Sequence, residues 1–247
     1  MAKEIEFTKY KERGACHWDE TKRSIFRFNA DQEARFEWIL CCLGDVKKKK
    51  VLDVGCGDGA LTYRIVKKGA EVIGLDNSEE GIRLAEQIFS EKKIPTRFIL
   101  ASAYKIPLES NSIDCVVLSE VIEHVAEPEK ILSEIQRVLK PEGKVVISTP
   151  YRLSEIPGQF HVKEYYPSEL KSLLAKYFSG IEIIETHPAF WTFSYAYGIP
   201  WLRKREIFRW LINISVLYFR YNPFLRDNRN RKRFDCFTQI IAVAHKK

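Results

Sequence analysis

The chain has 247 residues, 45% hydrophobic and 30% charged, which is typical of a soluble globular protein with one or two domains. Its six cysteines are scattered without a repeated CxxC spacing, which argues against a structural zinc site or a disulfide framework and favours a reducing cytoplasm. The net charge of +7 is uneven, because residues 200–247 hold 12 basic and three acidic side chains; a local anionic partner is therefore expected.

Residues 1–45 are predicted to be helical and to precede a sheet, with Asp31 as a candidate helix N-cap. The first ten residues are polar and charged, so we expect no signal peptide. Two interpretations of the segment remain open, a helix packed on the sheet edge or a lid that covers the substrate.

A short buried strand at 51–54 is followed by alternating glycines at 55, 57 and 59 and by an amphipathic helix over 61–68. Glycines in such a turn let the backbone bend tightly or approach a ligand closely. A strand, a glycine turn and a helix in this order form the cofactor-binding corner of an open α/β sheet.

Strands and helices alternate through the rest of the chain, which predicts a parallel sheet. Residues 186–235 are too many for an ordinary connection and form an aromatic, basic insertion. The further elements are strands at 71–76, 97–100, 112–118, 144–148, 181–185 and 236–244, helices at 78–90, 128–139 and 168–177 with Ser78 and Ser168 as N-caps, and a turn at 141–143.

The glycine turn allows two kinds of cofactor. Its pattern can be interpreted as GxGxxA with Asp76 about 20 residues downstream, as in dinucleotide-binding proteins. However, Asp53 and Asp58 would repel the phosphates of a dinucleotide. A ligand with a cationic amine and a sulfonium, such as S-adenosylmethionine, tolerates these acids better.

Three separated motifs agree in order and spacing: DVGCGDGALT (53–62), VIGLDNS (72–78) and the stretch 112–150. With them the chain resembles class I S-adenosylmethionine-dependent methyltransferases, in the group that contains quinone-ring O-methyltransferases. The resemblance is close over 48–150, weaker at 17–20 and 161–170, and absent from the insertion. It implies one α/β domain over 1–247, with a Rossmann-like seven-stranded, mostly parallel sheet, helices on both faces and an antiparallel last strand. Its parts would be a helical lid (1–45), a cofactor-binding core (46–150) and an acceptor-side half (151–247).

The resemblance also implies a cofactor site. Asp53 would brace the glycine loop and the cofactor's amino group, Asp76 would accept the ribose hydroxyls, and Asn77 would lie beside the adenine. The acidic residue usual after the third strand is replaced by Ser102, which accepts one weaker hydrogen bond. The full set of expected cofactor-binding residues is Asp53, Gly55, Cys56, Gly57, Gly59, Asp76, Asn77, Ser102, Ala103, Ser119 and Glu120.

Candidate catalytic residues follow the fourth and fifth strands. Glu123 and His124 would share a helix face with Glu120 if a helix begins there, and His124 could act as general base toward a phenol or enol hydroxyl. The alternative is a packing or capping role. His161, with Glu164, is a second candidate base or a loop salt bridge.

Two further possibilities concern the same site. His17 could reach over it from the N-terminal segment. Glu120, Glu123, His124 and His161 could bind a divalent metal, but their spacing does not require one, and we predict no metal.

The insertion carries an apolar stretch over 207–219 with basic residues on both sides. We expect it to cap a pocket for a small, hydrophobic acceptor, with peripheral membrane contact through 201–233. The simpler alternative is a helical cap or a dimer contact. The predicted reaction is in-line O-methylation; the alternatives are RNA methylation through the basic C-terminal region and a non-catalytic cofactor-binding protein.

Overall fold

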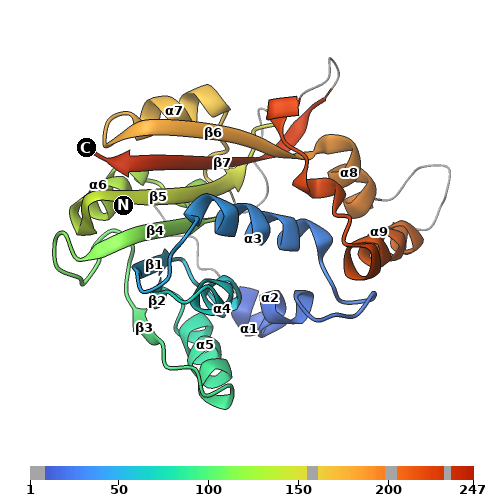
Figure 1. Cartoon of the computed structure of the whole chain (residues 1–247), viewed down its shortest axis with the longest axis horizontal. Coiled ribbons are helices and arrows are strands. Elements are labelled where there is room, and N and C mark those ends of the chain that lie inside the picture. Colours follow the sequence, from blue (N-terminus) through green and yellow to red (C-terminus); the bar gives the residue numbers. More distant parts are fainter. Residues whose placement is uncertain (1–8, 155–160, 198–204, 231–234) are drawn as a thin grey trace.

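A computed structural model describes residues 9–154, 161–197, 205–230 and 235–247. Its centre is one seven-stranded sheet in the order β3-β2-β1-β4-β5-β7-β6 (Figure 1). Neighbouring strands are parallel except in the two pairs that include β7, which confirms the predicted mostly parallel sheet with an antiparallel last strand. The strands are β1 (Lys50–Val54), β2 (Glu71–Asp76), β3 (Arg97–Leu100), β4 (Ile113–Ser119), β5 (Leu139–Pro150), β6 (Phe178–Pro188) and β7 (Phe237–Lys246).

Helices cover both faces of the sheet, so the central strands are apolar on both sides. Helices α3 and α4 pack with one buried cluster, and α6 and α7 pack with the other. The helices are α1 (Lys9–Arg13), α2 (Cys16–Glu20), α3 (Ala30–Leu43), α4 (Ala60–Lys67), α5 (Glu79–Glu91), α6 (Pro128–Val138), α7 (Pro167–Leu174), α8 (Ala189–Tyr197) and α9 (Arg205–Phe219), with 3-10 turns η1 (Ile122–His124), η2 (Pro223–Leu225) and η3 (Asn228–Asn230).

Two predicted caps are wrong. Helix α3 is capped by Asn29, whose side chain accepts a hydrogen bond from the amide of Gln32 at 3.2 Å, while Asp31 lies in the first turn. Helix α7 begins at Pro167 after Tyr166, so Ser168 also lies in the first turn. Ser78 does cap α5 as predicted, since its hydroxyl accepts from the amide of Gly81.

Strand β5 is longer than predicted. It begins at Leu139 and continues through the predicted turn at 141–143. In place of the predicted turn, the strand has a local irregularity. Its register with β4 shifts between Ile113 and Cys115, and Glu142 has a positive φ of 64°.

The insertion forms two helices, α8 and α9, followed by η2 and η3, and it begins later than predicted because β6 extends to Pro188. Figure 1 places α8 and α9 beyond the end of β6 and the start of β7, and α9 next to α3. A small apolar cluster joins α8, α9 and Phe224 to the start of α3. Residues 198–204 and 231–234, which include part of the predicted membrane-contacting stretch, lie outside the described residues. Within the part of the chain that is described, no helix has the length and apolar character needed to span a bilayer.

Candidate functional site

The glycine loop lies at the carboxyl end of β1 and leads into α4. Gly55, Gly57 and Gly59 all have positive φ, at 75°, 52° and 77°. The amide of Gly55 donates to the carbonyl of Leu75 at 2.7 Å, which ties the loop to β2. A Cβ at Gly57 would lie 1.8 Å from the Tyr10 hydroxyl, so a side chain there has no room. Glycine is therefore required at position 57 both by the left-handed backbone and by the close approach of Tyr10.

Asp76 ends β2 beside this loop and is nearly buried, with 8% of its surface exposed. One carboxylate oxygen accepts from the amide of Gly57 and the other from the amide of Ser78, both at 2.8 Å. Burial raises the pKa of this carboxyl. A carboxylate has about four lone-pair sites, so these two bonds leave capacity for ribose hydroxyls. Asn77, the next residue, is exposed at the same edge.

The loop after β3 adjoins Asp76, because the amide of Ala101 donates to the carbonyl of Asp76 at 2.9 Å. Ser102 and Ala103 follow and are half-buried. The hydroxyl of Ser102 accepts a hydrogen bond from the amide of Tyr104 at 3.3 Å. At the position where the resemblance implies an acidic residue, this chain thus has a hydroxyl that already accepts a hydrogen bond from the backbone.

Asp53 lies beneath the glycine loop and is buried, as is Cys56. The hydroxyl of Thr62, in the first turns of α4, donates to Asp53 at 2.6 Å. Burial raises the pKa of Asp53 to about 7, although the Thr62 hydrogen bond opposes the shift. In this structure Asp53 therefore connects β1 to α4.

Ser119 and Glu120 lie at the carboxyl end of β4, next along the same sheet edge. Glu120 has a positive φ of 55°, which is uncommon for a residue other than glycine. One oxygen of Glu120 accepts from Gln239 at 2.6 Å and from the hydroxyl of Ser148 at 3.1 Å. The hydroxyl of Ser148 also lies 2.9 Å from that of Ser119.

Arg35 was missed by the sequence analysis. Its guanidinium lies 3.4 Å from the second oxygen of Glu120, and its Nε has no hydrogen-bond partner among the described residues. Arg35 shares one face of α3 with Gln32 and Ile39, both of which are buried. A polar residue at a buried helical position is the sequence signal that could have identified it.

The two pairs of candidate catalytic residues, Glu123 with His124 and His161 with Glu164, lie next to each other. The rings of His124 and His161 lie 5.1 Å apart in an edge-on arrangement, and Nδ1 of His161 lies 2.6 Å from Glu164. The link is direct, since the amide of Val162 donates to the carbonyl of Glu123 at 2.7 Å.

Glu123 is buried at the centre of this histidine cluster, defined here as Glu123, His124, His161 and Glu164. One of its oxygens accepts from Thr149, and the other has no hydrogen-bond partner among the described residues. Burial, and next the charge of Glu120, raise the pKa of Glu123 well above its usual range. One ligand atom from each of Glu123, His124 and His161 lies within 4.8 Å of the others, so the arrangement could hold a metal ion.

The expected shared helix face is not formed. The 3-10 turn η1 begins at Ile122, and Glu120 precedes it in a left-handed conformation. Glu120 therefore belongs to the network with Arg35 and Gln239, while Glu123 and His124 face the segment at 161–164.

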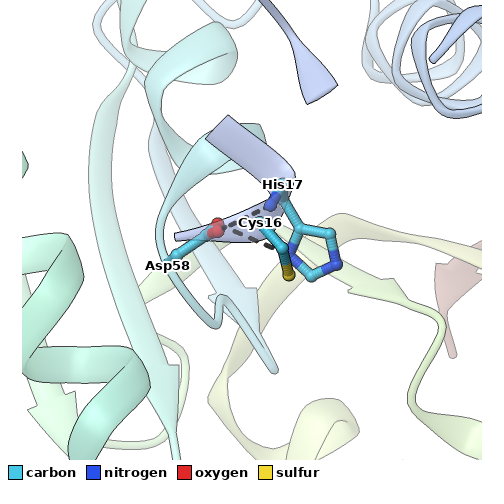
Figure 2. A group of neighbouring side chains, drawn as sticks. All are labelled: Cys16, His17 and Asp58. Carbon is cyan, nitrogen blue, oxygen red and sulfur yellow. Dashed lines mark hydrogen bonds and ion pairs between the residues drawn. The ribbon is translucent and has the colours of Figure 1, made fainter. Parts of the chain in front are cut away.

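The N-terminal segment lies directly over the glycine loop (Figure 2). The indole of Trp18 donates to the carbonyl of Asp58 at 2.5 Å, and the amide of His17 donates to its carboxylate at 2.9 Å. Tyr10 is buried against Gly57 and Gly81. His17 thus contacts the glycine loop, and no local pattern in the sequence indicated the positions of Tyr10 and Trp18.

Comparisons with known proteins point in one direction. The family model described as "Methyltransferase domain" matches residues 45–187. A ubiquinone biosynthesis O-methyltransferase from Leptothrix cholodnii is 29% identical over 230 residues, covering 90% of this chain and 88% of the relative. One from Photorhabdus laumondii is 35% identical over 139 residues, covering 55% and 57%. The crystal structure of a SAM-dependent methyltransferase from Archaeoglobus fulgidus has the same fold, with a TM-score of 0.61, 21% identity, and coverage of 93% of this chain and 98% of that one.

Proposed function

The chain belongs to the methyltransferase-domain family and is an S-adenosylmethionine-dependent methyltransferase, and from this premise we propose that it methylates a hydroxyl of a small, hydrophobic aromatic acceptor. The observation that carries the proposal is the histidine cluster at the edge of the sheet where the cofactor loop also lies. The names of the ubiquinone biosynthesis relatives support a quinone-precursor ring as the acceptor. None of the relatives named above supports RNA methylation or a non-catalytic role.

The cofactor residues divide the ligand among them. The backbone of Gly55, Gly57 and Gly59 contacts the methionine part once Tyr10 moves off Gly57, and Asp76 accepts from the ribose hydroxyls. Arg35, with its unpartnered Nε, suits the methionine carboxylate. When bound, S-adenosylmethionine supplies the sulfonium methyl group that passes in line to the acceptor oxygen.

His161 acts as the general base. Its Nδ1–H donates to Glu164, which fixes the tautomer and leaves the lone pair of Nε2 to take the acceptor's hydroxyl proton. His124 lies edge-on to it and orients the acceptor ring. Burial raises the pKa of Glu123, which favours the protonated form that can donate a hydrogen bond within the cluster.

Turnover and cofactor affinity separate this proposal from a structural role for the histidines. In His161→Ala we expect turnover to fall by roughly 10²–10⁴-fold, the usual contribution of a general base, with the affinity for S-adenosylhomocysteine near that of the wild type. Glu164→Gln should give a smaller loss and a shifted pH profile. Turnover is measured with a set of phenols as acceptors, and their methoxy counterparts, which lack the hydroxyl, serve as controls. Unchanged turnover in the His124→Ala/His161→Ala double variant would overturn the assignment.

We also propose that the insertion contacts lipid while an acceptor enters. Exposed apolar side chains gather on α8 and α9 and just after them, in an array that suits an interface between water and bilayer. They are Phe190, Phe193, Tyr197, Ile207, Leu211, Tyr218, Phe219 and Tyr221. Co-sedimentation with anionic vesicles tests this: Tyr218→Ser/Phe219→Ser should reduce binding, whereas Leu100→Ser, which alters an exposed apolar residue on β3, should not. Equal vesicle binding by the wild type and both variants would contradict the proposed lipid contact.

A further inference from the structure

A second group of metal-ligating side chains lies where the N-terminal segment meets the glycine loop. Cys16 and His17 begin helix α2, and Asp58 comes from the glycine loop, so the three meet only in the folded chain (Figure 2). One ligand atom from each lies within 4.8 Å of the others. Cys16 and Asp58 are buried, whereas 24% of the His17 side chain is exposed. The proposed methylation makes no use of this group.

The geometry suits a tetrahedral ion. Nδ1 of His17 and Oδ1 of Asp58 are 3.4 Å apart. Two ligands at about 2.0 Å from a zinc ion and at a tetrahedral angle would lie about 3.3 Å apart. The other carboxylate oxygen of Asp58 holds the His17 amide at 2.9 Å, so coordination through Oδ1 preserves that bond.

The chemistry of the ligands selects the ion. Thiolate and imidazole favour Zn²⁺, whereas Mg²⁺ and Ca²⁺ take oxygen ligands. Three protein ligands leave the fourth position for water, on the side where His17 is exposed. A cation there would also balance the charge of Asp58, whose carboxylate is wholly removed from solvent.

We propose that Cys16, His17 and Asp58 form a zinc site that fastens the N-terminal segment to the glycine loop. Because its ligands come from two segments, ion binding depends on the segment lying in place. The same placement puts the Tyr10 hydroxyl against Gly57, and that hydroxyl lies 3.4 Å from Nδ1 of His17. The absence of a CxxC repeat does not bear on this site, since its ligands are separated along the chain.

Cobalt spectroscopy of the full-length, metal-stripped protein tests the proposal. Co²⁺ bound by a thiolate gives a near-ultraviolet sulfur-to-cobalt charge-transfer band together with the visible bands of a tetrahedral ion. We expect these bands in the wild type, their stoichiometric loss on addition of Zn²⁺, and no charge-transfer band in Cys16→Ser. Cys41→Ser is the matched control, because Cys41 is exposed and lies outside the cluster.

A second measurement tests the proposal even if the Cys16 variant does not fold. In His17→Ala, which alters a partly exposed side chain, Zn²⁺ affinity measured against a chromophoric chelator should fall by at least about tenfold, because even the loss of a group that only hydrogen-bonds to a ligand can cause such a change. Circular dichroism would establish that the variants are folded. The proposal is overturned if the wild type shows no charge-transfer band, as for cobalt bound only by Glu123, His124 and His161, or if Cys16→Ser retains it.

Discussion

Asp53 is a residue whose protonation is set by its position beneath the glycine loop. Its pKa is raised from 3.8 to about 7 because the carboxyl is buried, and the nearby charge of Asp76 adds to the shift. In the unfolded chain the same carboxyl ionises near 3.8. Between these two pH values, unfolding therefore releases a proton from Asp53, and the free energy of unfolding falls as pH rises. Above about pH 7 both states are ionised and no further loss occurs.

Substitution of Asp53 by asparagine should remove this pH dependence. The side-chain oxygen of Asn can still accept from Thr62, so the contact at 2.6 Å is retained while the titrating proton is lost. Between roughly pH 4.5 and 6.5, in the middle of this window, the slope of unfolding free energy against pH should change by about 1.4 kcal/mol per pH unit toward more positive values. Urea titrations at several pH values measure it. An unaltered slope would show that Asp53 titrates normally in the folded protein.

At the scale of elements, the sheet was predictable because each buried strand is a short apolar run bounded by turn residues. Helix caps were less predictable from the sequence. Asn29 and Asp31 are both residue types that favour the N-cap, and which one caps α3 depends on which side-chain oxygen reaches the amide of Gln32. Contacts between distant segments had no local signal. The contact of Tyr10 with Gly57 depends on how α1 packs against α5 and the glycine loop, and that of Arg35 with Glu120 depends on how α3 packs on the sheet.

The docking of α9 on the N-terminal segment depends on Asn213, which is buried. Its amide nitrogen donates to the carbonyls of Phe28 and Ile25, at 2.8 and 2.9 Å. In Asn213→Ala the carbonyl of Ile25 loses this donor and that of Phe28 keeps the hydroxyl of Tyr195 at 3.1 Å, so we expect a loss of about 1–3 kcal/mol in unfolding free energy. Ser215→Ala, on the same helix but at an exposed hydrogen bond, is the control and should cost less. Equal stability of both variants would argue against a structural role for Asn213.

Across the whole molecule, the N-terminal segment connects the cofactor loop with the insertion. Near its start, Tyr10 and Trp18 lie on the glycine loop. Farther along, Arg23 donates to the carbonyl of Leu217 at 3.1 Å, and the ring of Phe26 packs edge-on against Trp210. A ligand that displaces Tyr10 from Gly57 must therefore disturb a segment that also holds α9.

We expect cofactor binding to change the hydrogen–deuterium exchange of the insertion through its contacts with this N-terminal segment. S-adenosylhomocysteine, placed on the glycine loop, competes with Tyr10 for the face of Gly57, so the contacts of residues 23–28 with α9 should change. Hydrogen–deuterium exchange of the amides in 205–219 should differ between the free and ligand-bound protein. In Asn213→Ala, which loosens the connection, the ligand-induced difference in α9 should shrink while protection of the glycine loop persists. Helix α6, which packs on the other face of the sheet, is the internal reference. If α9 exchanges identically with and without ligand in the wild type, the N-terminal segment does not couple the two regions.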